Sequence, residues 1–311
     1  MLNPFQPLEK IETEVFMSMP AKFRKKGRSK WADANRQGDE IECFLEGPSF
    51  DRDGNLWFVD IPYGRIFRIS TNADGKKDWE LVTQYDGWPN GLKIHKDGRI
   101  FIADYKEGLL TLDPKTGKLE QVLRTAHSEG FKGLNDLHFA LNGDLYFTDQ
   151  GQTGIADPTG RVYRLSAEGR LDRLCSNIPS PNGITLSTTE KHIYVGVTRS
   201  LQIWRLPLML DGTISKTGVA VQVSGGVGPD GIEMDAENGL YCCHVGLGIW
   251  RFDSNMLPTH LIHSTDHKHH HLSNLAFGGP DRKDLYITEA MSGDILIAKA
   301  PVAGKKLYAH M

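Results

Sequence analysis

GPSFDRDGNLWFVD, residues 47–60, is the stretch that decides the fold: two apolar segments joined by an Asp-Gly turn, with an aspartate ending the second segment. Asp-Gly favours a tight two-residue turn, and Val, Phe and Trp favour extended strands. The same pattern returns as GLKIHKDGRIFIAD at 91–104 and as NDLHFALNGDLYFTD at 135–149. The sequence therefore predicts a β-hairpin that is repeated along the chain.

Three further copies of the hairpin follow at 183–196, 231–244 and 274–289, and most units continue into a second β-like pair, such as GRIFRIS at 64–70. Four strands in about 45 residues, repeated six times, are typical of a six-bladed β-propeller. We therefore expect an all-β protein with a single domain over residues 1–311.

A propeller must also close its ring of blades. Residues 1–40 are expected to form an N-terminal extension and closing strand, because too few residues follow the sixth hairpin to finish its blade. A strand at 11–16, or one at 41–45, could complete the sixth blade. Long amphipathic helix patterns are missing, which argues against Rossmann and TIM-barrel folds and leaves a pair of β-sandwiches as the alternative.

The composition favours a small-molecule ligand. A formal net charge of −3 over 311 residues gives no reason to expect nucleic acid or an acidic membrane as a partner. The N-terminal residues lack the pattern of an export signal, and no apolar run of about 18 residues occurs, so we expect a cytoplasmic protein. The four cysteines lack CxxC spacing and are expected to be reduced. The cationic run KFRKKGRSK at 22–30 is read as a solvated loop, with an anion-binding lid as the alternative.

A polar residue stands at the same phase of every unit, four positions before the last apolar residue of the first strand. These six residues are Glu46, Asn90, Asn135, Asn182, Asp230 and Ser273. The first strand of each blade lines the central channel, so equivalent positions should form a ring about the axis. Six converging oxygen-bearing side chains, two of them carboxylates, are costly to gather without a positive partner. The alternative is that each residue only forms a turn.

Hard oxygen ligands, without Cys or His in the ring, favour one divalent cation. Calcium is the first expectation, ahead of magnesium, and manganese or zinc could occupy the same ligands. The ring therefore predicts a metal site at one end of the channel.

The chain resembles the SMP-30/gluconolactonase/LRE family of six-bladed propellers, on the motifs EGPSFDRDGNLWFVDI, NDLHFALNGDLYFTD, PNGITLSTTEKHIYV, PDGIEMDAENGLY and SNLAFGGPDRKDLYIT. The resemblance implies a lactonase-type activity and a divalent cation, usually calcium. The ligands that it implies are Glu46 of EGP, Asn135 of LND, Asn182 of PNG and Asp230 of PDG. Sugar lactonases of the family carry an arginine shortly before the ND motif, whereas the only cation here is Lys132, which argues against an aldonolactone substrate.

The leading hypothesis is a metal-dependent hydrolase acting on a small lactone, with Asp230 as metal ligand and general base and Glu46 as the second choice of base. Asn90 and Ser273 complete the ring and could orient the substrate, or could only satisfy backbone groups. Of the rim histidines, His271 could face the substrate or belong to a solvated loop, and His244 could reach the rim or be buried.

Two rival functions remain open at this point. The same metal site could serve a lyase, isomerase or aldolase-like reaction without hydrolysis, which product analysis would reveal. Alternatively, the chain could be a calcium-stabilised binding propeller with no turnover, and metal removal would then change melting only.

Overall fold

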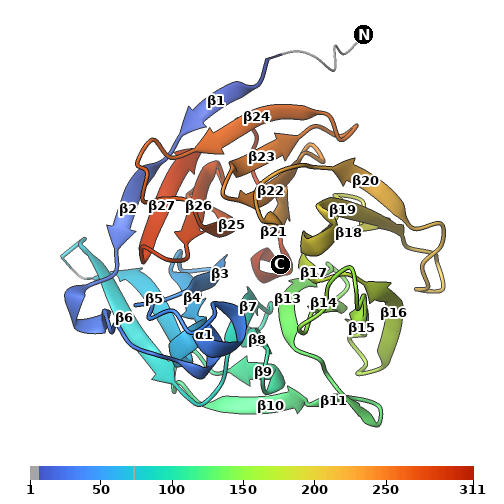
Figure 1. Ribbon diagram of the computed structural model, residues 1–311, viewed down its shortest axis with the longest axis horizontal. Helices are drawn as coiled ribbons and strands as arrows, with labels where there is room; N and C mark the ends of the chain where they lie inside the picture. The colour runs from blue at the N-terminus through green and yellow to red at the C-terminus, as the bar shows by residue number, and fades with distance from the viewer. Residues whose placement is uncertain (1–6, 73) are drawn as a thin grey trace.

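Each repeat folds as an antiparallel sheet, and the computed structural model, which describes residues 7–72 and 74–311, arranges six sheets around a central axis (Figure 1). The innermost strands are β3 (Leu45–Phe50), β7 (Pro89–Ile94), β13 (Leu134–Phe139), β17 (Pro181–Leu186), β21 (Gly228–Met234) and β25 (Leu272–Gly278). The second strands are β4 (Leu56–Asp60), β8 (Ile100–Asp104), β14 (Leu145–Asp149), β18 (His192–Val197), β22 (Leu240–Val245) and β26 (Asp284–Glu289).

The outer half of each blade completes this pattern. The third strands are β5 (Arg65–Thr71), β9 (Gly108–Leu112), β15 (Gly160–Leu165), β19 (Gln202–Pro207), β23 (Gly248–Phe252) and β27 (Asp294–Lys299). The outermost strands are β6 (Lys77–Gln84), β10 (Leu119–Leu123), β16 (Leu171–Ile178), β20 (Gly218–Gln222), β24 (Pro258–His263) and β2 (Glu14–Ser18). A small hairpin of β11 (Thr125–Ala126) and β12 (Glu129–Gly130) lies beside the second and third blades. The predicted six-bladed propeller is confirmed.

The N-terminal segment closes the ring. β2 pairs antiparallel with β27, from Glu14 opposite Ile297 to Ser18 opposite Asp294, and so becomes the outer strand of the sixth blade. The alternative segment at 41–45 is not used, because Ile41 bridges Gly27 and Leu45 already begins β3. An additional strand, β1 (Glu9–Glu12), pairs in parallel with β24 and extends the fifth blade.

The aspartates that end the second strands of the first three repeats fix the loops of one face. Asp60 accepts a hydrogen bond from the Phe44 N–H at 2.7 Å, and Asp149 accepts from the Lys132 and Gly133 N–H groups at 2.7 and 2.9 Å. Both carboxylates are fully buried. They satisfy backbone donors of the segments that lead into β3 and β13, and so help to hold the start of each innermost strand in place.

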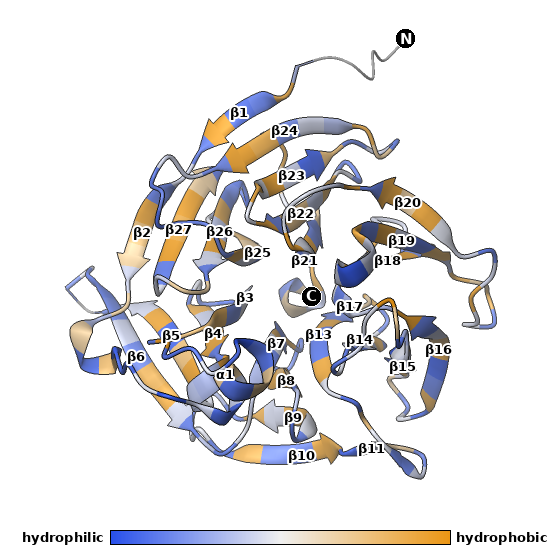
Figure 2. Ribbon diagram, viewed as in Figure 1, coloured by the Kyte–Doolittle hydropathy of each residue, from blue (hydrophilic) through white to orange (hydrophobic). Residues whose placement is uncertain are grey.

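The end of the channel toward which the innermost strands run is covered by the C-terminal segment, whose terminus lies at the centre of the ring (Figure 1). The short helix η4 (Tyr308–His310) packs Tyr308 against Phe139, with ring centroids 5.4 Å apart. Arg52 Nε donates to the Ala309 carbonyl at 2.9 Å. Figure 2 shows hydrophobic residues concentrated in the strands, whereas many loops and much of the helix α1 (Lys30–Asn35) are hydrophilic. In the part of the chain described, no helix is long and apolar enough to span a bilayer.

Candidate metal centre and active site

The six polar residues of the predicted ring lie near the start of the innermost strands, at the channel mouth opposite the C-terminal segment. Five of them are buried, namely Glu46, Asn90, Asn135, Asn182 and Ser273, and Asp230 is partly exposed. Each innermost strand packs against that of the next blade, and β25 packs against β3. The structure therefore places the predicted residues around one axis at one mouth. We refer to this set as the ring.

Glycines directly after ring residues allow the innermost strands to approach closely. A Cβ atom on Gly47 would lie 2.5 Å from the Asn90 carbonyl oxygen, and one on Gly183 would lie 2.4 Å from that of Asp230. Real Cβ atoms do not come so near to backbone atoms, so a side chain at either position would push two blades apart. The motifs EGP, PNG and PDG therefore contain a packing requirement as well as the ring residue.

This packing yields a prediction for Gly183→Ala. We expect the free energy of unfolding to fall by about 1–3 kcal/mol, because the new methyl group meets the backbone of β21. Gly218→Ala in the outer strand β20 is the matched control, since a Cβ there meets no atom within 4 Å. Denaturant unfolding of both variants measures the difference. Equal stability of the two variants would contradict the close approach.

Glu46 is the most constrained carboxylate of the ring. Its Oε2 atom accepts hydrogen bonds from the Gly47 N–H and from Asn274 Nδ2, both at 2.9 Å. Burial, followed by repulsion from the Asp230 carboxylate, raises the pKa of Glu46 well above its usual value, although these two hydrogen bonds lower it. Residues 46 and 230, far apart in the sequence, therefore act on each other electrostatically.

Asp230 is held in a similar environment. Burial of its carboxyl group raises its pKa to about 7, against the lowering effects of a hydrogen bond from the Asn182 side chain and of the Arg199 charge. Repulsion from Asp136 adds to the increase. Its surroundings thus favour the protonated form of Asp230 in the protein without a cation.

Asp136 and Asn274 are site residues that the sequence analysis missed. Each directly follows a ring residue. The other four units have glycine at this position, and the departure from glycine was the sequence signal that could have identified these two residues. Burial raises the pKa of Asp136 to about 6, although the nearby Lys93 charge lowers it. Asn274 supports Glu46 through the hydrogen bond described above. The mouth therefore holds a third carboxylate and a fourth amide.

The donor set fits a cation with oxygen ligands. None of Glu46, Asp136 and Asp230 forms an ion pair with Lys or Arg within residues 7–72 and 74–311, although each repels another. Among these residues no three His, Cys, Asp or Glu side chains converge closely enough to hold a metal by themselves. Amide oxygens would have to complete the site. Asn135 is suited to this because its Nδ2 atom donates to Gln150 Oε1 at 3.0 Å, which leaves its own oxygen available.

The predicted substrate-binding residues differ in how free their side chains are. The Ser273 hydroxyl donates to the Leu45 carbonyl at 2.9 Å and is buried, and His244 Nε2 lies 2.8 Å from the Gly225 carbonyl oxygen. Lys132 is exposed, and Asn90 is buried at its ring position. Their roles toward a substrate stay predictions.

The histidine run at 267–271 is partly structural. His269 is buried between Asp294 and Ser264, with both distances 2.9 Å. His271 is half-buried, and its N–H donates to Glu289 Oε1 at 2.7 Å. Burial lowers the pKa of the His271 imidazole, and the Arg36 charge lowers it further, so the neutral form of this ring is favoured. Of the run, His271 therefore remains the candidate for substrate contact.

Charged side chains fill the channel beneath the ring. Lys93 Nζ lies 3.4 Å from Glu233 Oε2, the Thr185 hydroxyl donates to Glu233 Oε1 at 3.0 Å, and Lys305 Nζ donates to the Leu186 carbonyl at 2.6 Å. Burial alone would raise the pKa of Glu233, but Lys93, with His138 and Lys305, lowers it to about 2. This charged network lies between the ring and the C-terminal segment, which covers the other end of the channel.

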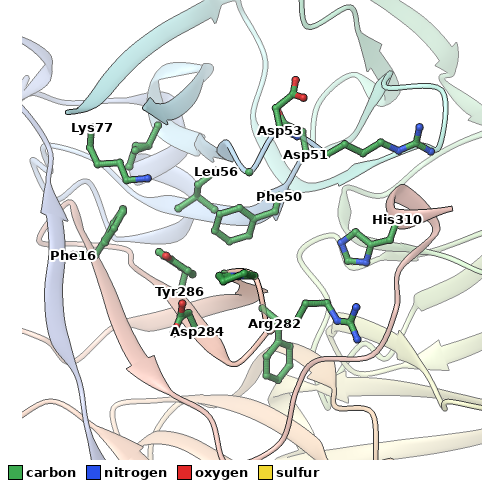
Figure 3. Close-up of a pocket in the computed structure, with 17 residues that line it drawn as sticks. Phe16, Phe50, Asp51, Asp53, Leu56, Lys77, Arg282, Asp284, Tyr286 and His310 are labelled. Atoms are coloured by element: carbon green, nitrogen blue, oxygen red, sulfur yellow. The ribbon is translucent and has the colours of Figure 1, made fainter. Parts of the chain in front are cut away.

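A cleft of about 710 Å³ lies elsewhere, between the first and sixth blades (Figure 3). Phe50, at the end of β3, Tyr286 and Arg282 are among the residues that line it, together with His310 of the C-terminal segment. No ring residue borders this cleft. It is therefore separate from the candidate site.

Comparisons with known proteins agree with this architecture. A family model described as "SMP-30/Gluconolactonase/LRE-like region" matches residues 44–291. The chain is 32% identical over 231 residues to a protein named lactonase drp35 from Staphylococcus aureus, which covers 70% of this chain and 67% of that relative.

Solved structures share the fold at lower identity. A gluconolactonase from Xanthomonas campestris superposes with a TM-score of 0.73 at 21% identity, covering 93% of this chain and 99% of the other. A calcium-binding protein, regucalcin, from Agrobacterium tumefaciens gives a TM-score of 0.71 at 21% identity, covering 97% and 100%. At such identity these two likenesses establish the fold alone.

Proposed function

Because the chain belongs to the SMP-30/gluconolactonase/LRE-like family, we propose that it is a lactonase, which opens a small cyclic ester with water. The observation that carries this proposal is the gathering of Glu46, Asp136 and Asp230 at one channel mouth without a cationic partner among the described residues. The curated lactonase relatives, at 32% identity, support the same activity.

We further propose that Glu46, Asn135, Asn182 and Asp230 hold one divalent cation, with calcium as the first choice. The fold neighbour named as a calcium-binding protein supports that choice. When bound, the cation would polarise the lactone carbonyl and stabilise the negative charge that develops on its oxygen. Asn135 and Asn182 would present their amide oxygens, and Asn274 would keep the Glu46 carboxylate oriented through its hydrogen bond.

Asp230 is proposed to move the proton. It is the ring carboxylate that retains solvent exposure, so it can accept a proton from a water molecule as that water attacks the carbonyl carbon. The bond between the carbonyl carbon and the ring oxygen then breaks, and the proton passes to that oxygen as it becomes a hydroxyl group. Glu46, which is buried and bears two hydrogen bonds, is less free to do this.

A pH-indicator screen of five- and six-membered lactones tests this function. The protein is stripped of metal and assayed after separate additions of calcium, magnesium, manganese and zinc. We expect hydrolysis that depends on one of these ions and releases one carboxylic acid per lactone. Consumption of substrate without acid release would favour a lyase or isomerase, and a calcium-dependent rise in melting temperature without any turnover would favour a binding protein.

The raised pKa values predict how pH affects the metal-free protein. Asp230 titrates at about 7 when folded and at about 3.9 when unfolded, so the folded state binds more protons between these values. The free energy of unfolding should therefore fall as pH rises from about 5.5 to about 8, and Glu46 acts in the same direction. Calorimetry of metal-free protein over this range measures the trend.

Calcium should reverse that trend, because binding requires ionised carboxylates and releases their protons. Calcium affinity is expected to rise with pH over the range in which Asp230 ionises, by up to about tenfold per unit from this carboxyl group alone, and ionisation of Glu46 adds to the rise. Isothermal titration in buffers of different ionisation enthalpy measures the protons released. Affinity that does not change between about pH 5.5 and 8 would contradict the assignment of Asp230 as a ligand.

A further inference from the structure

Two arginines stand at the ring mouth without a carboxylate partner. Most arginines of the chain are paired, as Arg65 is with Asp60 and Arg251 with Asp235. Arg36, directly after α1, and Arg199, within the short helix η3 (Thr198–Ser200), form no ion pair among the described residues. Unpaired guanidinium groups beside a carboxylate-rich mouth are available to a ligand.

Arg199 is held next to the ring by its neighbour. The Thr198 hydroxyl donates to the Pro229 carbonyl at 2.7 Å, and Pro229 directly precedes Asp230. The contact is tight, since a Cβ atom on Gly228 would lie 2.3 Å from the Thr198 carbonyl oxygen. The Arg199 side chain itself is exposed. It forms no ion pair among the described residues, so it stands beside the mouth without closing a salt bridge there.

Arg36 is placed over the same mouth by α1. Trp31, in α1, is buried against Phe44 and Ile61 of the first blade. At the other end of α1, Asn35 Oδ1 accepts a hydrogen bond from Gln152 Nε2 at 3.0 Å, in the loop that follows β14 of the third blade. The helix therefore reaches from the first blade to the third, and Figure 1 shows it close to the inner ends of β4 and β7.

The Arg36 side chain is also incompletely satisfied. Its Nε atom is buried and has no hydrogen-bond partner among the described residues. Its charge acts on His271 of the sixth blade. The nearest carboxylate to His271, Glu289, is occupied by backbone N–H groups of residues 271, 291 and 292. Among the described residues no carboxylate pairs with this guanidinium, which leaves its terminal N–H groups for a bound molecule.

We propose that Arg36 and Arg199 form an anion-recognition pair above the ring and that the substrate is a small lactone bearing a carboxylate group. This proposal rests on the lactonase function proposed above. A guanidinium group offers paired N–H donors that match the two oxygens of a carboxylate. A phosphate, with nearly two charges, would meet more repulsion from Glu46, Asp136 and Asp230 than a singly charged carboxylate does.

Two lactones that differ in one group test the pair. The first is 5-oxotetrahydrofuran-2-carboxylate, and the second is γ-valerolactone, in which a methyl group replaces the carboxylate. We expect Arg36→Gln and Arg199→Gln each to lower kcat/KM for the carboxylate lactone by about 10- to 100-fold, mainly through KM. Turnover of γ-valerolactone, which lacks the carboxylate, should fall much less, so the ratio of the two kcat/KM values is the quantity that reports the pair.

Two further variants make the result specific. Arg36→Lys keeps the charge but loses the paired donors, so it should retain part of the preference for the carboxylate lactone. Arg173→Gln, in the outer strand β16, removes another arginine that has no ion pair among the described residues and should change neither lactone. Melting temperatures confirm that each variant is folded.

Binding of tetrahydrofuran-2-carboxylate, which has no ester to hydrolyse, separates the two proposals. If the protein hydrolyses neither lactone but binds this carboxylate with a Kd that rises in both glutamine variants, the anion pair stands and the lactonase proposal fails. If the protein hydrolyses both lactones and the glutamine variants leave their ratio unchanged, the lactonase stands and the anion pair is wrong. Absence of both carboxylate binding and carboxylate-lactone turnover also overturns the pair.

Discussion

Asp230→Asn is expected to lower kcat at least about a hundredfold while the propeller stays folded, because the variant loses the carboxylate that accepts the proton from water. Asparagine has nearly the same size, and it already occupies three of the six ring positions. The variant also removes a carboxylate whose ionised form is disfavoured by its surroundings, since its pKa is raised to about 7, so stability without metal should not fall. Steady-state kinetics on the lactone found by the screen, together with calorimetry, measures both quantities.

The calcium content of Asp230→Asn shows which role has been lost. If the variant binds calcium but turns over slowly, Asp230 acts mainly as the base. If calcium is lost as well, Asp230 acts as a ligand, and excess calcium should restore binding before it restores activity. Glu237→Gln, an exposed carboxylate in the turn after β21, is the control and should leave kcat unchanged. Turnover by Asp230→Asn close to that of the control would remove Asp230 from the mechanism.

The propeller and the ring could be predicted because both follow from a period in the sequence. Residues spaced 43 to 48 apart occupy the same place in successive blades, so symmetry brings Glu46 and Asp230 together without any knowledge of loops. The closing strand was predicted for a related reason, because too few residues follow the sixth hairpin to complete its blade. The sequence left two N-terminal segments as candidates for the closing strand, and the pairing of β2 with β27 decides between them.

Features outside the period were harder to predict. Asp136 was overlooked because the position after the ring carries glycine elsewhere, where its role is close packing of strands. Arg36 lies in the N-terminal extension and reaches the mouth only because α1 spans from the first blade to the third. Such a crossing depends on tertiary contacts of Trp31 and Asn35, which leave no periodic signal in the sequence. The cationic run at 22–30 was read as a solvated loop, with an anion-binding lid as the alternative. Arg24 and Arg28 of this run pair with Glu42 and Asp33.

Repulsion among the mouth carboxylates destabilises the metal-free protein, and the proposed cation would relieve that repulsion. Burial disfavours the charged form of Glu46 and Asp230, and each is further destabilised by a neighbouring carboxylate. A carboxylate whose charge stabilised the fold by itself would instead have a lowered pKa. Replacing a ligand should therefore change the stability of the metal-free and the calcium-bound protein in opposite directions.

Glu46→Gln gives the sharpest form of this expectation. Glutamine can keep both hydrogen bonds of the native side chain, because the Gly47 N–H and Asn274 Nδ2 donate to the same atom, Oε2, which a single amide oxygen can replace. The variant loses only the negative charge. Metal-free Glu46→Gln should thus melt at a higher temperature than the metal-free wild type at about pH 8, and the difference should shrink toward pH 5, where wild-type Glu46 is protonated.

With calcium the order should reverse. We expect Glu46→Gln to lose at least about a hundredfold in calcium affinity, since a ligand carboxylate is gone. At a calcium concentration about one hundred times the wild-type Kd, the wild type gains about 2.7 kcal/mol in free energy of unfolding, whereas the variant gains less than about 0.5 kcal/mol. Calorimetry with and without calcium measures whether the order of stability of the two proteins reverses. Equal calcium stabilisation of both proteins would place the cation away from Glu46, and lower stability of the metal-free variant at alkaline pH would show that this carboxylate supports the fold by itself.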